Sequence, residues 1–147
     1  YSHKLYQSMV KKIMDETNIG FMSHIGGLGL KKLDTNNFEF SVVVKEIHLN
    51  SGKITHGGFL STIADTGMGT AAHMLVENRR CVTISLDVKF ISAAFLNQTL
   101  IGKVKIQKKT KSLIFISCEI LNSEGIVVTA SGVWKILQSL KREHLTK

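Results

Sequence analysis

The sequence of 147 residues contains no proline and only two cysteines, Cys81 and Cys118. Two thiols are too few for a disulfide framework or for a zinc site built on cysteine. Both lie in apolar, strand-like segments, so we expect buried thiols in a reducing compartment. No apolar run approaches the roughly 18 residues of a membrane span, and the first residues lack a secretion-signal pattern. We therefore expect a cytoplasmic protein, or an organellar one that has lost a leader.

Aromatic residues make up only 7% of the chain, and 11 acidic residues oppose 19 Lys and Arg, a formal net charge of +8. Binding to nucleic acid would call for aromatic side chains that stack on bases, so no nucleic-acid partner is expected, and that class stays the more distant alternative. The charge favours an anionic ligand. Because 44% of the residues are hydrophobic, the chain can bury a core and is not of the disordered class.

The chain shows no internal repeat and no linker, which predicts one domain over residues 1–147. Leu5, Met9 and Ile13 follow a helical spacing and predict an N-terminal helix within residues 1–20. The glycine-broken stretch 25–30 is compatible with a strand or a loop. Alternating apolar residues predict a strand at 38–44, and residues 138–147 form a basic tail.

Residues 56–76 contain alanine, methionine and glycine and have no charged face, apart from one residue, Asp65. A helix that is apolar nearly all round is a buried helix. Alternation then predicts four antiparallel strands, near 81–90, 98–107, 112–122 and 126–137. In the first of them, one face is expected to carry Val82, Ile84, Leu86, Val88 and Phe90, and the other Thr83, Ser85, Asp87 and Lys89. The order predicts an α+β fold, a curved antiparallel sheet wrapped around one long central helix.

Two features of the buried helix could carry chemistry. Gly57 and Gly58 fall at its start, where backbone N–H groups lack helical partners and could stabilise an oxyanion; alternatively, they only cap the helix or relieve crowding. Asp65 lies two turns further on, where a carboxylate is costly to bury unless it is paired. It is either a general base or a structural acceptor for Thr62 or for a backbone N–H.

The spacing of these features predicts an oligomer. Gly57 and Asp65 are eight residues apart, about 12 Å along a helix at 1.5 Å per residue. One small reacting centre needs both groups at about 3 Å. If both act on one bond, Gly57 of one subunit must face Asp65 of another, which predicts an obligate dimer.

Other motifs are weak or missing. His24, His48 and His73 lack the spacing of metal ligands, so no metal site is expected. A serine-hydrolase elbow and the common nucleotide-phosphate motifs do not occur. The run Lys108-Lys109-Thr110-Lys111 is either a solvated turn or a contact for a phosphorylated ligand.

At His56-Gly57-Gly58-Phe59 and Asp65, the sequence resembles the hotdog-fold acyl-CoA thioesterases, and most of all their PaaI-like branch in the 4-hydroxybenzoyl-CoA thioesterase superfamily. The resemblance extends over about residues 25–137. It implies a hotdog fold whose protomers join their sheets edge to edge, with two dimers forming a tetramer. The implied activity is hydrolysis of an acyl-CoA to a carboxylic acid and coenzyme A, without a metal or other cofactor. A hotdog hydratase, or an acyl-CoA sensor without turnover, is the alternative.

The resemblance also implies roles for single residues. The Gly57 N–H would polarise the thioester carbonyl, with His56 and Asn50 ordering that end of the pocket. Asp65 of the partner subunit would act as general base or nucleophile, and Thr83 would hold the attacking water. The residues expected to border coenzyme A are Ser85, Phe90, Lys108, Lys109, Thr110, Lys111, Ser112 and Leu113. One departure is the stretch Ser92-Ala93-Ala94, where the family often has a proline.

Overall fold

The computed structural model describes residues 2–77 and 79–138. Helices α1 (His3–Thr17) and α2 (Gly20–His24) precede strands β1 (Gly29–Lys32) and β2 (Asn37–Val43). A short 3-10 turn, η1 (Glu46–His48), leads to the long helix α3 (Gly57–Val76). The chain continues with four strands: β3 (Cys81–Phe90), β4 (Thr99–Lys109), β5 (Leu113–Asn122) and β6 (Gly125–Ile136).

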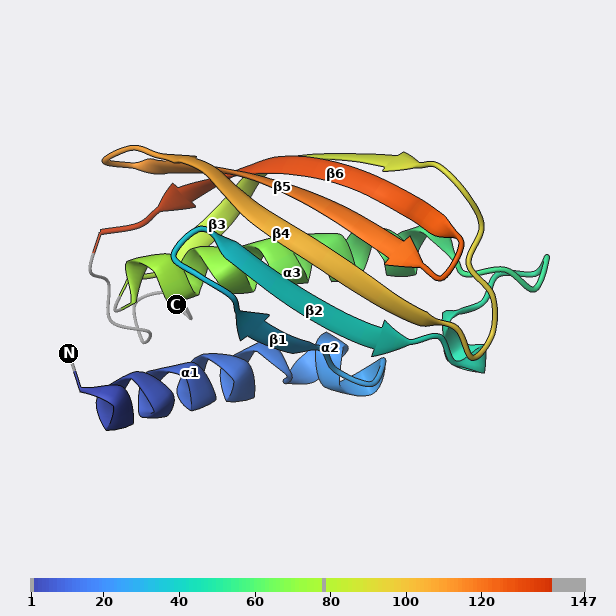
Figure 1. The fold of residues 1–147 in the computed structure, drawn as a ribbon, viewed down its shortest axis with the longest axis horizontal. Coiled ribbons are helices and arrows are strands. Elements are labelled where there is room, and N and C mark those ends of the chain that lie inside the picture. Colours follow the sequence, from blue (N-terminus) through green and yellow to red (C-terminus); the bar gives the residue numbers. More distant parts are fainter. Residues whose placement is uncertain (1, 78, 139–147) are drawn as a thin grey trace.

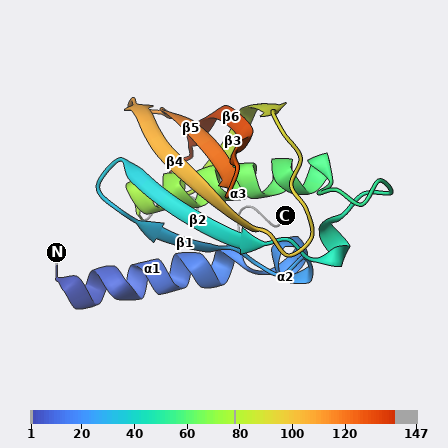
Figure 2. The same ribbon diagram turned by 45° about the vertical axis from the view of Figure 1, so that its right-hand side comes forward.

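All neighbouring strands pair antiparallel in one six-stranded sheet, in the order β1-β2-β4-β5-β6-β3. The sheet curves over α3, and α1 runs along the open side below β1, as the two views in Figures 1 and 2 show. The predicted α+β fold, a curved antiparallel sheet around one central helix with an N-terminal helix beside it, is thereby confirmed.

The core explains why α3 is built from small residues. Ile63, Ala64 and Met68 of α3 are fully buried beneath the sheet. The ring of Phe40, from β2, fills the space between α3 and β4: a Cβ atom at Gly67 would lie 2.4 Å from this ring, and one at Gly102 would lie 2.0 Å from it. Since both distances are too short for any side chain, these two glycines are required by packing.

The N-terminal helix ends at Thr17, inside the predicted range 1–20. Asn18 then leaves the helix and bonds both backbone groups of Leu28: the Leu28 N–H donates to Oδ1 at 2.8 Å, and Nδ2 donates to the Leu28 carbonyl at 3.0 Å. Within the stretch 25–30, Gly26 and Gly27 have positive φ and form a loop, and the strand begins only at Gly29. Residues 139–147 of the predicted basic tail lie outside the described residues.

Both cysteines are buried, as predicted. Burial raises the pKa of the Cys81 thiol to about 11 and that of Cys118 to about 12. The two thiols therefore stay protonated near neutral pH, which agrees with a role in packing.

Strand β3 carries a β-bulge between Thr83 and Ser85, and this corrects the predicted faces of the strand. Thr83 pairs with Trp134 and Phe90 pairs with Val128, two residues of β6 that are buried under the sheet. Paired residues of antiparallel strands share a face, so Thr83 and Phe90 both face α3. An uninterrupted strand would have put them on opposite faces, because they are an odd number of residues apart.

Among the described residues, strand β3 is also an edge of the sheet, since its one paired neighbour there is β6. Several of its apolar side chains are exposed, including Val82 (43%), Ile84 (55%) and Phe90 (56%). An exposed edge with unpaired backbone groups and apolar side chains is a natural place for another strand to add.

Packing around Phe40 can be tested with Gly102→Ala. The added methyl group meets the buried ring of Phe40, so we expect the free energy of unfolding to fall by about 1–3 kcal/mol. Urea denaturation measures this. The matched control is Gly29→Ala in β1, where an added Cβ has nothing within 4 Å; equal losses in the two variants would contradict the account of the core.

Candidate active site

The start of α3 is held in place by backbone hydrogen bonds. The His56 N–H donates to the His48 carbonyl at 2.8 Å, and the Thr55 N–H donates to the Ala94 carbonyl at 2.9 Å. The His48 ring is buried against the ring of Phe59, with 3.7 Å between centroids. These contacts fix the position and direction of the first turn of α3.

The His56 side chain caps the backbone N–H of Gly58 but not that of Gly57. Nδ1 of His56 accepts a hydrogen bond from the Gly58 N–H at 2.8 Å. A Cβ atom at Gly58 would lie 2.9 Å from the same nitrogen, so the cap by His56 is a structural reason for glycine at this position. The Gly57 N–H makes no hydrogen bond within the described part of the chain. Among the first donors of the helix, it is therefore open to an acceptor from outside the chain.

The ring of Phe90 lies beside Gly57. A Cβ atom at Gly57 would be 3.3 Å from Cζ of the Phe90 ring, and Phe90 itself is 56% exposed. The ring forms an apolar wall beside the positive end of the helix dipole.

Asp65 is half-buried on α3 and is paired with Thr83 of β3. The Thr83 hydroxyl donates to Oδ1 of Asp65 at 2.8 Å. Thr62, the partner considered in the structural interpretation, instead donates its hydroxyl to the Gly58 carbonyl at 2.8 Å. The bond from Thr83 orients the carboxylate, and within the described residues its other oxygen, Oδ2, has no hydrogen-bond partner.

The two candidate groups cannot meet within one chain. Gly57 and Asp65 lie on the same uninterrupted helix, Gly57–Val76, and eight residues correspond to about 12 Å. The premise of the dimer prediction is therefore confirmed. The dimer itself stays a prediction.

Asp65 and Thr83 open onto a cavity of about 280 Å³ that also borders α1, α2 and β6. Of the residues that line this cavity, the sequence predicted Asp65 and Thr83 as site residues but not the others. Those on α3 could have been predicted, because they recur at helical spacing after Asp65. These further residues are Ile13, Glu16, Thr17, Met22, Thr66, Gly69, Thr70, His73, Arg80, Cys81 and Trp134.

Asn50 lies in the loop before α3. Its Oδ1 accepts hydrogen bonds from the Gly52 N–H at 2.8 Å and from the Ile54 N–H at 3.3 Å. Asn50 therefore orders the loop that leads into α3, at the same end as His56 and Gly57. No hydrogen bond joins it to either residue.

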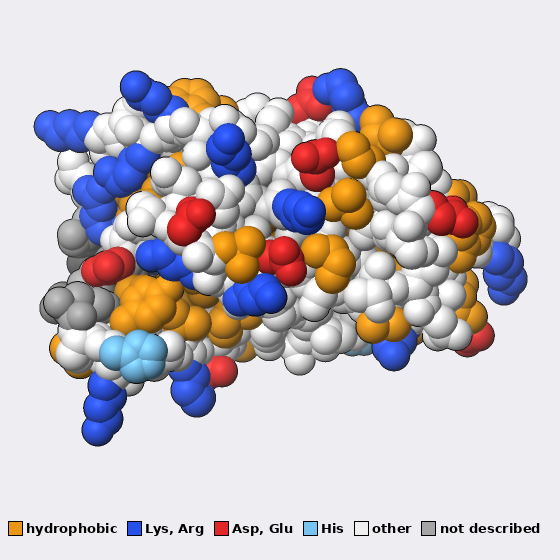
Figure 3. All heavy atoms as spheres, viewed as in Figure 1, with side chains coloured by type: hydrophobic (Ala, Val, Ile, Leu, Met, Phe, Trp, Pro, Cys, Tyr) orange, Lys and Arg blue, Asp and Glu red, His pale blue; other side chains and the backbone are white. Residues whose placement is uncertain are grey.

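The lysine-rich segment forms the turn between β4 and β5. Thr110 closes this turn, since its N–H donates to the Leu113 carbonyl at 2.8 Å and its Oγ1 accepts from the Leu113 N–H at 3.0 Å. Lys108, Lys109 and Lys111 are exposed. In Figure 3, Lys and Arg side chains gather toward the left end of the molecule, where the β4–β5 turn lies in Figure 1.

The sheet places this turn near Thr83. Ile114 pairs with Trp134, which in turn pairs with Thr83, so two strand spacings, about 10 Å, separate the start of β5 from Thr83. Ser85 is exposed on the same edge strand as Thr83. Along β3, the lysine turn and Ser85 therefore lie near the end that carries Thr83, whereas Phe90 lies at the other end, beside Gly57. Ser85 pairs with Val133 and so faces away from α3, unlike Thr83.

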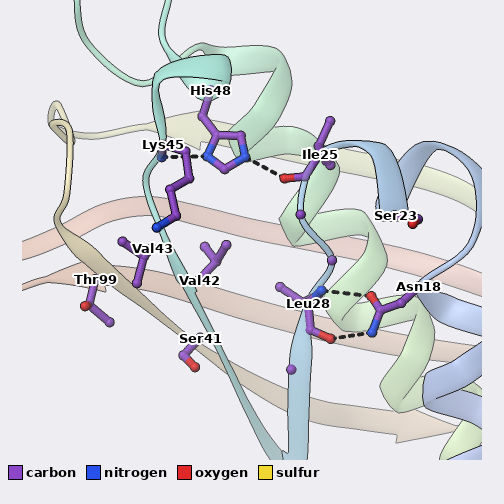
Figure 4. Close-up of a pocket in the computed structure, with 13 residues that line it drawn as sticks. Asn18, Ser23, Ile25, Leu28, Ser41, Val42, Val43, Lys45, His48 and Thr99 are labelled. Atoms are coloured by element: carbon purple, nitrogen blue, oxygen red, sulfur yellow. Dashed lines mark hydrogen bonds between the residues drawn. The ribbon is translucent and has the colours of Figure 1, made fainter.

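A larger cavity, about 580 Å³, lies elsewhere, between the loop 25–29 and β2. Figure 4 shows the bonds that frame it, those between Asn18 and Leu28 and those of the His48 ring. The ring accepts from the Lys45 N–H at 2.9 Å and bonds the Ile25 carbonyl at 2.7 Å. No predicted site residue lines it, and its framing groups already have partners.

Two kinds of feature are absent from residues 2–77 and 79–138. No three or more His, Cys, Asp or Glu side chains are grouped so that they could hold a metal ion. No helix in these ranges combines the length and the apolar character needed to cross a membrane.

Comparison with known proteins identifies the family. Residues 52–129, more than half of the chain, match the family described as the Thioesterase superfamily. A curated Pseudomonas aeruginosa protein, "Putative esterase PA0474", is 33% identical over 94 residues, which cover 63% of this chain and 70% of that protein.

Solved structures show the same fold. The hypothetical thioesterase protein of Streptococcus pneumoniae TIGR4, solved with coenzyme A, has a TM-score of 0.77 at 20% identity and covers 87% of this chain and 99% of its own. The E. coli PaaI protein of the phenylacetic acid degradation operon has a TM-score of 0.77 at 19% identity, covering 89% and 95%. The resemblance to the hotdog-fold thioesterases is thereby confirmed. The chain belongs to the thioesterase superfamily.

Proposed function

We propose that this protein is an acyl-CoA thioesterase whose active sites lie between two subunits, each built from Gly57 of one chain and Asp65 of the other. The observation that carries the proposal is the open Gly57 N–H on the same helix as the oriented Asp65 carboxylate. Membership of the thioesterase superfamily supports thioester hydrolysis in general. The streptococcal relative that was solved with coenzyme A supports the acyl-CoA class.

The Gly57 end binds the thioester carbonyl. A backbone N–H at a helix start, next to the positive end of the dipole, stabilises the negative oxygen that develops when the carbonyl is attacked. His56 contributes indirectly: it occupies the Gly58 N–H and fixes the first turn, leaving the Gly57 N–H for the substrate. Asn50 orders the loop that precedes this turn.

The Asp65 end supplies the base or the nucleophile. As a base, the carboxylate takes a proton from water while the water oxygen bonds to the carbonyl carbon; the C–S bond then breaks, and the leaving thiolate takes up a proton. The products are a carboxylic acid and coenzyme A. The Thr83 hydroxyl donates to Asp65, and its oxygen can still accept a hydrogen bond from the water.

As a nucleophile, Asp65 would bond to the carbonyl carbon itself and expel the thiolate, and water would then hydrolyse the mixed anhydride. Both routes need only the carboxylate, water and the N–H donor, so we propose catalysis without a metal or redox cofactor.

We propose that the subunits associate through the β3 edge. This edge presents unpaired backbone groups and exposed apolar side chains, such as Ile84 and Phe90. It also carries Thr83, the partner of Asp65, and Phe90, the neighbour of Gly57. A two-fold axis across this edge would therefore bring Asp65 of each chain toward Gly57 of the other. Assembly of two such dimers into a tetramer is part of the same proposal.

The anionic part of coenzyme A is proposed to lie along the lysine turn. Lys108, Lys109 and Lys111 are exposed near Thr83, and their positive charges attract phosphate groups. Ser85 and Phe90, on the edge strand, would border the rest of the coenzyme, together with the turn residues Thr110, Ser112 and Leu113.

The proposed function predicts the effect of Asp65→Asn. The amide keeps the shape and can still accept the Thr83 hydrogen bond, but it can neither take a proton nor attack a carbonyl. We expect kcat to fall by at least about 100-fold, measured as release of free thiol from a panel of acyl-CoAs. Asp15→Asn, an exposed carboxylate on α1, is the matched control. Absence of thiol release from every acyl-CoA by the parent protein would instead support the sensor or hydratase alternatives.

The shared site predicts complementation between two inactive variants. Gly57→Pro removes the N–H, and proline is well tolerated at the first position of a helix; His56, at φ −64° and ψ 134°, already has the conformation that precedes proline. After Gly57→Pro and Asp65→Asn chains are mixed and allowed to exchange, half of the dimers are mixed and each has one intact site. Activity should return to about a quarter of the parent value.

The control for that experiment is each variant incubated alone under the same conditions, which should stay inactive. If mixing restores no activity although mass spectrometry shows mixed dimers, Gly57 and Asp65 do not combine across subunits.

A further inference from the structure

A second hydrogen bond joins α3 to β3, beyond the one between Asp65 and Thr83. The Cys81 N–H donates to Nε2 of His73 at 3.3 Å. Cys81 is the first residue of β3 and lies two residues before Thr83. His73 lies eight residues after Asp65 on α3, which is about two helical turns. The start of β3 is therefore held to α3 at two places, and one of them is the proposed catalytic carboxylate.

The sheet explains why a side chain, and not a strand, bonds Cys81. The Leu137 N–H donates to the Arg80 carbonyl at 2.8 Å, so the backbone groups of Arg80 face β6. Successive residues of an antiparallel strand point their backbone groups in opposite directions. The Cys81 N–H therefore points to the free edge, where no further strand lies among the described residues. Cys81 is buried, and a buried N–H without a partner is costly, so His73 supplies the acceptor that a neighbouring strand would otherwise provide.

The His73 ring can accept this bond only when it is neutral. Nδ1 lies 2.8 Å from the Gly69 carbonyl, and because a carbonyl only accepts, Nδ1 carries the ring proton. Nε2 then holds the lone pair that accepts from the Cys81 N–H. In the imidazolium form both ring nitrogens carry a proton. Nε2 and the Cys81 N–H would then face each other as two donors, and the bond would be lost.

The surroundings of His73 favour the neutral ring. Burial has the largest effect and lowers the pKa of His73 below the ordinary value of 6.5; the charge of Arg80 lowers this pKa further, and that of Glu16, on α1, raises it. Arg80 and Glu16 line the same cavity as His73 and Asp65, and α2 and β6 contribute only uncharged side chains to it. The Cys81 thiol, whose pKa is raised to about 11, is also uncharged. His73 is therefore neutral near pH 7, where it can hold Cys81.

We propose that neutral His73 is a positioning residue for the reaction: by holding Cys81 to α3, it fixes the start of β3 so that the Thr83 hydroxyl meets Asp65. The inference rests on the proposed function. The β-bulge follows Thr83, so only a short paired segment, Cys81–Thr83, precedes it, and the regular pairing after the bulge does not fix where this segment lies. His73 is about 12 Å further along the helix than Asp65, so it acts through Thr83 and not on the reacting bond.

The first test compares the pH dependence of kcat in the parent protein and in His73→Gln, with the acyl-CoA that the parent hydrolyses fastest. Glutamine offers an acceptor oxygen and does not titrate. Below about pH 6.5, kcat of His73→Gln relative to the parent should rise by about tenfold as His73 takes up its proton, because a displacement of about 1 Å can cost up to 100-fold. Titration of Asp65 is common to both proteins and cancels in this ratio. His24→Gln, at an exposed histidine of α2, should follow the parent.

The second test asks whether His73 acts through Thr83. His73→Leu keeps a side chain of similar size but removes the acceptor, and should lower kcat at pH 8 by about tenfold. His73→Gln should retain most of the kcat that His73→Leu loses. In a Thr83→Ala background, His73→Leu should change kcat by no more than about twofold, because the hydroxyl that His73 positions is already absent. If His73→Leu does not fold, the pH dependence of His73→Gln decides alone.

Two results would overturn the inference while the proposed function stands. One is a parent that hydrolyses acyl-CoAs with a ratio to His73→Gln that does not change with pH. The other is an equal loss from His73→Leu with and without Thr83, which would give His73 a purely structural role. If the parent releases no thiol from any acyl-CoA, the proposed function fails, and the inference fails with it.

Discussion

The spacing of Gly57 and Asp65 on one helix is the constraint on which the account depends. The two residues are held about 12 Å apart by eight residues of regular helix, and α3 cannot bend to join them because its central residues are fully buried under the sheet. A donor and a carboxylate so fixed act on one bond only when two helices contribute one group each. The proposed chemistry therefore requires that two subunits associate.

The bulge in β3 connects the edge of the sheet to both ends of this helix. It lets Thr83 and Phe90 share the face toward α3, although they are seven residues apart. Thr83 then orients Asp65, and Phe90 lies against Gly57. The same strand is the free edge of the sheet. Strand β3 therefore carries both the side chains next to the proposed catalytic groups and the edge proposed to contact the partner subunit.

The helix and strands could be predicted from the sequence, whereas the bulge in β3 and the side-chain contacts of the site could not. The apolar character of residues 56–76 predicted the buried helix, and alternation predicted the strands, because both patterns are local. The bulge was missed, since nothing in the alternation of β3 marks where one residue is inserted. The bond from Thr83 to Asp65 and the cap of His56 on Gly58 depend on distances between elements. The walls of the Asp65 cavity come from α1, α2 and β6, which periodicity cannot bring together.

The most direct measurement is a crystal structure with a non-hydrolysable acyl-CoA analogue whose carbonyl is kept and whose thioester sulfur is separated from it by a methylene group. If the active site is shared, the carbonyl oxygen lies about 2.7–3.2 Å from the Gly57 nitrogen of one subunit, with the carboxylate of Asp65 of the other subunit on the opposite side of the carbonyl carbon. A structure in which one chain alone contacts the carbonyl, or in which the carbonyl lies away from the start of α3, would contradict it.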